Sequence, residues 1–460
     1  MTASSLDGLA ARCILAGFVG TEAPEWLVRW CERGLGGVVL FARNVESVEQ
    51  VARLTKALPG LLVAVDEEGG DVTRLEARTG SSYPGALALG TVDDTRLTAE
   101  VAAALAADLA RAGITMNLAP VADVNTNPDN PVIGVRSFGA DPELVARHVA
   151  AFVEGTQRQG VAACAKHFPG HGDTAVDSHL GLPVVDGDVD AALTPFRAAV
   201  EAGVQAVMTG HLLVSRVDPS EPATLSAPVL RLLREELGFA GLIVTDALEM
   251  GAISGTLGLG EAAVRALAAG ADALCLGADI GDAEVTEAHA ALVAAVTSGR
   301  IAAARLANAA ARVEAVAQWA APDPAGPGGA AAAAAARRAL RTEGDVHVDS
   351  PLVVELEAEP SIAAGRVGYD FRDAARRVWP DAVFDAADGD GRSLVLVLRD
   401  AGRRPEQQAA ARELLARHDH AVVVEIGLPG WQPVGAAGYV ATLGAGRVNL
   451  DAAAELLARG

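Results

Sequence analysis

Short apolar runs alternate with longer amphipathic segments over about the first 320 residues of the chain. Each run has four to six residues, most of them Val, Ile, Leu or Ala, and each is followed by a loop rich in Gly, Asp, His or Asn. The segments between the runs carry apolar residues at helical spacing, as in Leu193–Ala202 and Glu261–Ala269. This alternation is typical of repeated βα units around a parallel sheet.

Eight of these runs are expected to be strands. They are Ile14–Val19, Gly37–Phe41, Leu62–Val65, Met116–Pro120, Ala162–Lys166, Ala206–Thr209, Leu242–Thr245 and Ala273–Leu276. Eight βα units in about 300 residues predict a (β/α)8 TIM-type barrel over residues 1–320, with its active site on the loops after the strands. An open doubly wound sheet fits the same alternation, although no Gly-x-Gly-x-x-Gly follows any of these runs.

The pattern changes at residues 321–345. Three prolines break it, Pro322, Pro324 and Pro327, and seven alanines follow at Ala330–Ala336. We expect a linker that leads into a connecting helix. Further strands and a helix are predicted near Leu352–Glu357, Ser393–Leu398, Ala421–Ile426 and, for the helix, Glu406–His418. Residues 346–460 are therefore expected to form a smaller α/β sandwich domain.

The charge and the cysteine content of the chain exclude several classes of protein. Lys and Arg number 37 against 59 Asp and Glu, a net charge of −22, which argues against a nucleic-acid partner and against binding to an anionic membrane. No uncharged apolar run is long enough to span a bilayer. The four cysteines form no Cys-x-x-Cys pair, and no basic segment precedes an apolar stretch at the N-terminus. We therefore expect a cytoplasmic protein with reduced thiols.

The densest polar cluster follows the fifth predicted strand, from Lys166 to His179. It holds three His, two Asp and one Lys in fourteen residues, and its Pro and Gly residues exclude a helix. The cluster is expected to be an ordered loop at the end of the strand. A metal site and a solvated turn are the alternatives, but the spacing of the histidines matches no common zinc motif. The chain has 35 Arg and only two Lys, so the lysine at position 166 points to a need for a compact ammonium group, with a chance occurrence as the alternative.

Acidic residues end two other predicted strands. Asp246 follows an apolar run, where a carboxylate of a barrel can face the central pocket as a nucleophile or base. The same position would suit an N-cap of the next helix, and position alone does not separate the two interpretations. Asp66, Glu67 and Glu68 are consecutive acids, which need partners or a ligand if they are buried, and Arg74 lies close behind them.

Six motifs, in this order, resemble family-3 glycoside hydrolases, specifically the β-N-acetylglucosaminidase branch, over residues 10–320. They are Asp-x-Glu-Gly-Gly, Asn-Leu-Ala-Pro-Val-Ala-Asp, Arg-Ser-Phe-Gly, Lys-His-Phe-Pro-Gly-His-Gly-Asp-Thr with a trailing Asp-Ser-His, Met-Thr-Gly-His and Val-Thr-Asp-Ala-Leu-Glu-Met. The resemblance implies that Asp246 is the nucleophile, His179 the acid/base and Asp177 the partner of His179. It also implies a set of substrate-binding residues, namely Asp66, Arg74, Arg136, Lys166, His167 and His211. It implies no metal and no organic cofactor, and leaves the role of Glu67 open.

The expected function is that of a retaining exo-β-N-acetylglucosaminidase. Such an enzyme releases terminal GlcNAc from cell-wall fragments or chito-oligosaccharides through a covalent glycosyl-aspartate intermediate. Three alternatives keep the same barrel: a phosphorylase that takes inorganic phosphate as acceptor, a β-glucosidase, and a sugar-binding protein without catalytic activity. A metal-dependent barrel hydrolase is a further alternative. The expected partner is a small carbohydrate.

Overall fold

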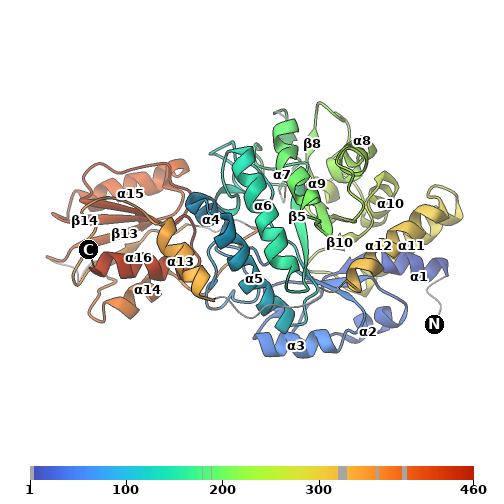
Figure 1. Cartoon of the computed structure of the whole chain (residues 1–460), viewed down its shortest axis with the longest axis horizontal. Coiled ribbons are helices and arrows are strands. Elements are labelled where there is room, and N and C mark those ends of the chain that lie inside the picture. Colours follow the sequence, from blue (N-terminus) through green and yellow to red (C-terminus); the bar gives the residue numbers. More distant parts are fainter. Residues whose placement is uncertain are drawn as a thin grey trace.

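The computed structural model describes residues 5–178, 180–187, 189–319, 329–358, 362–385 and 391–459. These residues form two domains that lie side by side (Figure 1). The larger domain contains residues 5–319, and the smaller one, drawn in orange and red, contains the second sheet of the chain. The N-terminal end lies on the larger domain and the C-terminal end on the smaller one.

Eight parallel strands form the sheet of the larger domain, in the order β10-β1-β2-β3-β4-β5-β7-β9. They are β1 (Ile14–Ala16), β2 (Gly37–Leu40), β3 (Leu62–Val65), β4 (Met116–Asn117), β5 (Ala162–Phe168), β7 (Ala206–Thr209), β9 (Leu242–Thr245) and β10 (Leu274–Leu276). The backbone N–H of Thr245 donates to the carbonyl oxygen of Ala273 at 2.9 Å, which brings β9 beside β10. The sheet is therefore a nearly closed barrel, which confirms the predicted (β/α)8 fold over the open sheet.

Two strands, β2 and β10, are one residue shorter than predicted, and three others depart further from their predicted bounds. The first ends at Ala16, and Val19, which the sequence places within it, is 63% exposed to solvent. The fourth has only two residues and ends before the cis Ala119–Pro120 peptide bond. The fifth continues to Phe168, two residues beyond its predicted end, so Lys166 and His167 belong to the strand itself.

Twelve α-helices surround the barrel in the described part of residues 5–319. They are α1 (Leu6–Arg12), α2 (Glu25–Glu32), α3 (Val48–Lys56), α4 (Ala86–Val92), α5 (Thr95–Arg111), α6 (Pro142–Gln157), α7 (Val189–Glu201), α8 (Ala227–Arg231), α9 (Gly251–Ser254), α10 (Leu259–Ala269), α11 (Asp282–Thr297) and α12 (Ala303–Ala317). Helix α6 shows why they form: Asp141 accepts a hydrogen bond from the Glu143 N–H at its start, and Pro142 occupies its first position. Its apolar residues repeat at helical spacing and are buried against the sheet.

The interior of the barrel is filled by small and medium-sized side chains. Ala64, Ala162, Ala206 and Ala273 are fully buried there, together with larger residues such as Leu15. The low aromatic content of the chain is consistent with this interior, which is a packed core rather than a channel. The polar side chains of the barrel therefore gather at the ends of the strands.

The smaller domain has a five-stranded sheet in the order β11-β15-β14-β13-β12, in which only β11 is antiparallel to its neighbour. Its strands are β11 (Arg341–Gly344), β12 (Leu352–Glu355), β13 (Leu394–Leu398), β14 (Ala421–Glu425) and β15 (Gly438–Ala441). Its helices are α13 (Gly329–Ala339), α14 (Phe371–Val378), α15 (Pro405–Leu415) and α16 (Arg447–Arg459). Alternate strand residues pack against α14 and α16 on one face and against α15 on the other. Strand β11 lies within residues 321–345, which the sequence predicts to be a linker and a connecting helix, and residues 321–328 of this segment are outside the described residues.

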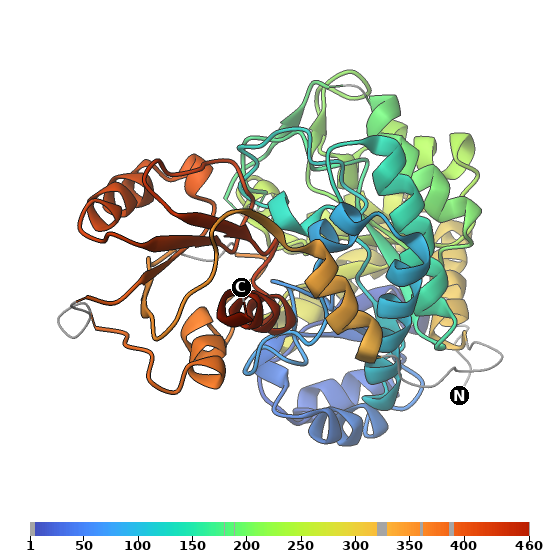
Figure 2. The same cartoon turned by 60° about the vertical axis from the view of Figure 1, so that its left-hand side comes forward.

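The two domains meet along one helix and along the loops at one end of the barrel. Helix α13 packs against α4 and α5 of the barrel and against α16 of its own domain, and Figure 2 shows it, in gold, beside the blue helices. On the loop after β3, Asp71 accepts a hydrogen bond from the Ala445 N–H at 2.7 Å and pairs with Arg399 at 3.2 Å. The smaller domain is thereby held against the carboxyl end of the barrel, where the active sites of such barrels lie.

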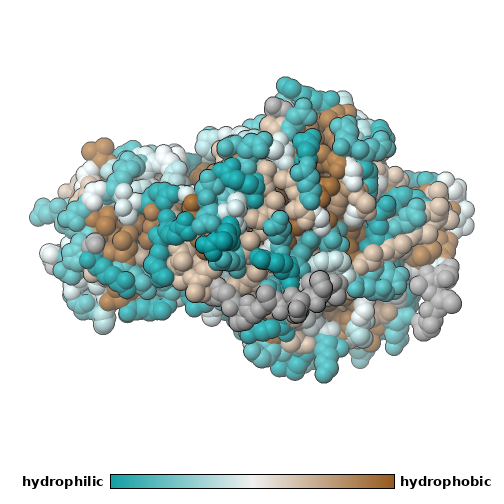
Figure 3. All heavy atoms as spheres, in the orientation of Figure 1, coloured by the Kyte–Doolittle hydropathy of each residue, from teal (hydrophilic) through white to brown (hydrophobic). Residues whose placement is uncertain are grey.

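Hydrophilic residues cover most of both domains on the face drawn in Figure 3, and hydrophobic residues occupy smaller areas between them. Among the described residues, none of the helices combines the length and the apolar character needed to cross a membrane.

Candidate active site

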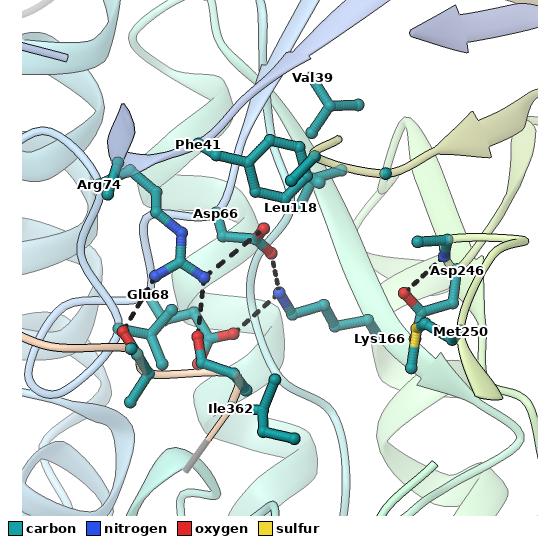
Figure 4. A pocket seen from close by; sticks show the side chains of 18 of the residues that line it. Val39, Phe41, Asp66, Glu68, Arg74, Leu118, Lys166, Asp246, Met250 and Ile362 are labelled. Carbon is teal, nitrogen blue, oxygen red and sulfur yellow. Dashed lines mark hydrogen bonds and ion pairs between the residues drawn. The ribbon is translucent and has the colours of Figure 1, made fainter. Parts of the chain in front are cut away.

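A cavity of about 550 Å³ opens at the carboxyl ends of the barrel strands. Its walls come from the segments that follow six strands, including Asp66 after β3, His171 after β5 and Asp246 after β9. Residues 362–366 of the smaller domain close one side of it. Figure 4 shows Arg74 and Asp246 on opposite sides of the cavity, with Lys166 between them.

Lys166 is the buried cation at the centre of this cavity. Its Nζ lies 2.5 Å from Oδ1 of Asp66 and 2.8 Å from Oε1 of Glu68, and its side chain is only 2% exposed (Figure 4). Burial by itself would lower the pKa of Lys166, but the carboxylates of Asp66 and Glu68 outweigh it and raise that pKa. Lys166 is therefore charged at neutral pH and presents a fixed ammonium group to the cavity.

Glu68 links this ammonium group to Arg136. The Nε and Nη2 atoms of Arg136 donate to the two oxygens of Glu68 at 2.9 and 2.7 Å, a paired geometry with both side chains buried. Burial acts to raise the pKa of Glu68, but Arg136 and Lys166 together hold it well below its usual range. The buried carboxylate is therefore ionised and compensated by two cations.

Arg74 reaches across the mouth of the cavity to the smaller domain. Its Nη2 donates to the carbonyl oxygen of Ala363 at 2.7 Å, and its Nη1 to that of Ala364 at 3.2 Å. The same Nη2 lies 4.0 Å from Oδ2 of Asp66. One guanidinium group thus lines the cavity of the barrel and contacts the backbone of the second domain at once.

Glu67 lies in sequence between Asp66 and Glu68, which line the cavity, but its side chain makes different contacts. Its Oε2 accepts hydrogen bonds from the backbone N–H groups of Arg74 and Leu75, at 2.8 and 3.0 Å. Its own backbone is held by the Asn117 side chain, which accepts from the Glu67 N–H and donates to the Glu67 carbonyl oxygen. Burial raises the pKa of Glu67 to about 7. Glu67 shapes the turn that carries Arg74 and does not line the cavity.

Two histidines after Lys166 are fixed by one aspartate. Asp123 is fully buried, and its Oδ2 lies 2.7 Å from Nδ1 of His167, while its Oδ1 accepts from the backbone N–H of His171 at 2.6 Å. Nε2 of His171 is 3.1 Å from Oγ of Ser178, and burial lowers the pKa of His171 to about 4. His171 is therefore neutral at pH 7 and is poorly suited to donate a proton there.

Asp246 lies at the end of β9, on the wall opposite Arg74 (Figure 4). Its backbone N–H donates to the carbonyl oxygen of Thr209 on β7, and one of its carboxylate oxygens accepts from the Ala247 N–H at 2.8 Å. The side chain is partly exposed to the cavity. Behind it, His211 is fully buried, and its Nε2 lies 2.9 Å from the carbonyl oxygen of Ala247. His211 supports the segment next to Asp246 and does not line the cavity.

The segment after β5 continues along the cavity as far as Ser178. The carbonyl oxygen of Ser178 accepts a hydrogen bond from the Ala252 N–H at 3.3 Å, in helix α9 just beyond Asp246. Asp177 lines a neighbouring cavity rather than this one. His179, the acid/base implied by the resemblance, lies outside the described residues.

The cavity thus brings together most of the residues that the sequence singles out. Those in its lining are Asp66, Arg74, Arg136, Lys166, His167 and Asp246. Sequence reasoning did not assign a site role to Glu68, although three consecutive acids after a strand are a signal for it. It also missed Ile362–Arg366, which lie in another domain and carry no local motif. Within the described residues, no group of three or more His, Cys, Asp or Glu side chains could hold a metal ion.

Comparisons with known proteins agree with this geometry. The model of the "Glycosyl hydrolase family 3 N terminal domain" matches residues 21–316. "Beta-hexosaminidase A" of Pseudoalteromonas piscicida is 38% identical over 281 residues, which are 55% of this chain and 46% of that protein. The chain spans about half the length of the first curated relatives that it matches.

Two solved structures extend the likeness. A glycoside hydrolase family 3 β-N-acetylglucosaminidase from Paenibacillus sp. str. FPU-7 has a TM-score of 0.88 at 33% identity and covers 99% of this chain and 96% of its own. A β-N-acetylhexosaminidase from Beutenbergia cavernae DSM 12333 has a TM-score of 0.62 at 31% identity and covers 68% of this chain and 98% of its own. With the family model matching well over half of its length, the chain belongs to glycosyl hydrolase family 3.

Proposed function

We propose that this protein is a retaining exo-β-N-acetylglucosaminidase that releases terminal GlcNAc from β-linked sugars. The observation that carries the proposal is the position of the Asp246 carboxylate across one cavity from the cluster of Lys166, Asp66 and Arg74. The names of its relatives, β-hexosaminidase and β-N-acetylglucosaminidase, support GlcNAc as the sugar. Cell-wall fragments and chito-oligosaccharides both end in such a residue and are the proposed substrates.

The proposed reaction has two steps, in which the bond between Asp246 and the sugar is first formed and then broken. In the first, the ionised carboxylate of Asp246 attacks the anomeric carbon while the bond to the leaving oxygen breaks, and His179 gives its proton to that oxygen. In the second, His179 takes a proton from water, the water oxygen attacks the anomeric carbon, and Asp246 leaves as a carboxylate. Two displacements at one carbon retain the β configuration.

Charged groups at the far wall hold the sugar over Asp246. The Asp66 carboxylate can accept hydrogen bonds from hydroxyl groups, and the cations of Lys166 and Arg74 can donate to hydroxyl oxygens. Because these side chains are already fixed by one another, little reorganisation accompanies binding. The ring is thereby positioned for attack before the chemical step begins.

A histidine as acid/base suits neutral conditions. Its ordinary pKa near 6.5 allows it to give and to take a proton in one turnover. Asp177, two residues earlier, is proposed to orient the imidazole and to stabilise its cation. All four cysteines are unpaired thiols, which supports the proposed cytoplasmic location.

A phosphorylase is the second candidate, because the proposed base is an imidazole. After it has given up its proton, an imidazole is neutral and does not repel an incoming phosphate dianion as a carboxylate would. Phosphate could then take the place of water in the second step and yield GlcNAc-1-phosphate.

One assay tests both candidates. Hydrolysis of aryl β-GlcNAc is measured against hydrolysis of aryl β-glucoside, with and without inorganic phosphate. Faster turnover of the GlcNAc compound, with the β-anomer of GlcNAc as first product, supports the proposal. Preference for the glucoside contradicts it, as does the absence of turnover of either compound, which would leave a sugar-binding protein. A product of GlcNAc-1-phosphate in the arm with phosphate would make the enzyme a phosphorylase.

A further inference from the structure

Strand β5 is irregular where it reaches the candidate active site. Its pairing with β7 shifts register between Ala165 and Phe168, where β5 advances by three residues while β7 advances by two. An extra residue of this kind is a β-bulge, which redirects the side chains beside it. In a regular strand Lys166 and His167 would point to opposite faces of the sheet, whereas here both of them line the cavity.

The side chain of Asp123 supports this irregular segment. Asp123 lies in the loop after β4 and is fully buried, and the hydroxyl group of Ser137 donates to its carbonyl oxygen at 2.6 Å. Its Oδ1 accepts hydrogen bonds from two backbone N–H groups, that of His167 at 3.2 Å and that of His171 at 2.6 Å. One carboxylate oxygen thus fixes the backbone at both ends of the turn from His167 to His171.

The second oxygen of Asp123 faces the imidazole ring of His167. This oxygen, Oδ2, lies 2.7 Å from Nδ1 of the ring. An ionised aspartate is an acceptor on both of its oxygens, so the nitrogen beside Oδ2 carries the proton. The hydrogen bond made by one ring nitrogen of a histidine sets the state of the other. Nε2 is then the nitrogen that remains for a ligand in the cavity, which His167 lines.

Lys166 supplies a complementary donor one residue earlier. An ammonium group has three N–H donors, and Nζ of Lys166 contacts Asp66 and Glu68 at 2.5 and 2.8 Å, which leaves one donor for a ligand (Figure 4). A sugar hydroxyl group that accepts a hydrogen bond from this ammonium group still has its own proton to donate. An unprotonated Nε2 of His167 is an acceptor for that proton, whereas a protonated Nε2 would place a second donor in the same part of the cavity.

We propose that Asp123 is a positioning residue that keeps the proton of His167 on Nδ1, so that Nε2 accepts a hydrogen bond from a hydroxyl group of the bound sugar. The inference rests on the proposed glycosidase function and adds the direction of one of its hydrogen bonds. It also gives a role in substrate binding to Asp123, a residue that lies outside the cavity lining.

The first test reads the position of the proton directly. The full-length protein is labelled with ¹⁵N in its histidine rings, and the signals that disappear in the His167→Gln variant are assigned to His167. Long-range correlation spectra between ring protons and ring nitrogens then show which nitrogen bears the proton. The proposal predicts a protonated Nδ1 and an unprotonated Nε2 at neutral pH. A protonated Nε2, alone or together with Nδ1, would overturn it.

The variant Asp123→Asn tests whether the carboxylate is the cause. Its amide oxygen can still accept from the two backbone N–H groups, but its NH2 group then faces Nδ1 and donates to it, which moves the proton to Nε2. We expect the inverted tautomer, and kcat/KM for aryl β-GlcNAc should fall roughly tenfold or more, as for other polar groups that lose their partner in a buried site. Asp129→Asn, at an exposed position on the same loop, is the matched control and should change neither.

Deoxy sugars separate a lost hydrogen bond from a disturbed fold. The 3-deoxy, 4-deoxy and 6-deoxy forms of aryl β-GlcNAc are hydrolysed by the wild-type protein and by Asp123→Asn, and kcat/KM is compared for each. For the compound that lacks the hydroxyl group bound by Nε2, the variant should be nearly as active as the wild type. A general disturbance of the fold would instead lower kcat/KM for every compound by the same factor.

The outcomes separate the inference from the function on which it rests. No hydrolysis of aryl β-GlcNAc by the wild-type protein would overturn the proposed function, and the spectra would still decide where the proton of His167 lies. A tautomer that stays unchanged in Asp123→Asn would overturn the inference alone. Equal losses of kcat/KM with all the compounds would also overturn it, since Asp123 would then act only through the stability of the fold.

Discussion

The Nη2 atom of Arg74 in the barrel lies 2.7 Å from the carbonyl oxygen of Ala363 in the smaller domain, to which it donates a hydrogen bond. The same guanidinium group lies 4.0 Å from Asp66, whose other oxygen contacts Lys166. A single side chain therefore connects the buried charges of the cavity to the backbone of the second domain. We therefore expect a ligand in the cavity and the position of that domain to be coupled through it.

Replacing Arg74 by Ala should weaken both connections. We expect kcat/KM to fall roughly 10- to 100-fold, because hydrogen bonds from a charged group are worth about 1.5–3 kcal/mol. Amide hydrogen exchange in residues 362–366 should also become faster, since two of their carbonyl oxygens lose a donor. Arg53→Ala, at an exposed position on α3, is the control. Exchange at wild-type rates in the Arg74 variant would show that Arg74 does not hold this segment.

Asp246→Ala should abolish turnover while the fold stays intact. Loss of a covalent nucleophile typically lowers kcat by roughly 10⁴-fold or more, and Asp246 is only partly buried, so its removal leaves little empty space. Mass spectrometry after reaction with a 2-deoxy-2-fluoro or 5-fluoro glycosyl probe should find the label on Asp246. A label on Asp66 instead would contradict the assignment. Asp349→Asn, at an exposed position in the smaller domain, serves as the surface control.

His179→Ala should be most harmful when the leaving group is poor. Nitrophenolate departs with little help from a proton, whereas a sugar alkoxide does not. The loss of kcat/KM on a disaccharide should therefore exceed that on nitrophenyl GlcNAc by roughly 10²–10⁴-fold, the usual contribution of general acid catalysis. Asp177→Asn should show a smaller loss with the same trend. Equal losses on the two substrates would refute the acid role, and His347→Ala is the control histidine.

Lys166→Met should lower stability as well as activity. Without the ammonium group, the largely buried carboxylates of Asp66 and Glu68 lose a shared cation. Removal of one member of a buried ion pair costs about 3–5 kcal/mol, and urea unfolding would measure it. Arg300→Met removes an exposed pair with Glu261 and should cost less than about 1 kcal/mol. If the two variants lost similar amounts of unfolding free energy, burial would not make the ion pairs of Lys166 more important for stability than an exposed pair.

The buried carboxyl group of Glu67 should make stability depend on pH. Burial raises its pKa from the ordinary 4.5 to about 7. A group whose pKa is higher in the folded state stabilises the fold fully below its unfolded pKa, and this contribution is lost as the pH rises through about 7. Wild-type protein should therefore lose more stability between pH 5 and pH 8 than Glu67→Gln does, by up to about 3 kcal/mol.

The Gln variant is a fair comparison because its amide oxygen can still accept from the N–H groups of Arg74 and Leu75. The Tm of both proteins at the two pH values measures the effect. Glu413→Gln changes an exposed glutamate, 75% accessible, and should behave as wild type. Parallel pH profiles for wild type and Glu67→Gln would mean that Glu67 ionises in the folded state at its ordinary pKa.

The barrel could be predicted from the sequence because a short run of apolar residues marks each of its strands. Leu62–Val65, Ala206–Thr209 and Leu242–Thr245 are short apolar runs between polar loops, and the structure has strands at the same bounds. Parallel strands buried on both faces produce such runs directly. In contrast, β11 (Arg341–Gly344) is exposed along its whole length and polar in sequence, so no apolar run marks it.

The candidate site was only partly visible in the sequence for a related reason. Asp66, Lys166 and Asp246 lie in or directly after predicted strands, and the barrel topology alone brings such positions to one end. The pairing of Glu68 with Arg136 joins residues that are far apart in the chain, and no local sequence pattern predicts it. The contribution of residues 362–366 depends on how two domains meet, which no spacing within either domain determines.

Helix α13 has a consequence for the spacing of the two domains. Its buried side chains are only methyl groups, from Ala332, Ala335, Ala336 and Ala339, and the helix contacts α4 and α5 of the barrel and α16 of the smaller domain. It thus acts as a thin spacer whose side chains set how closely the smaller domain approaches the barrel. Exchanging one of these alanines for a larger residue would widen that spacing, so the contact of Arg74 with the carbonyl oxygen of Ala363 could be altered from positions outside the cavity lining.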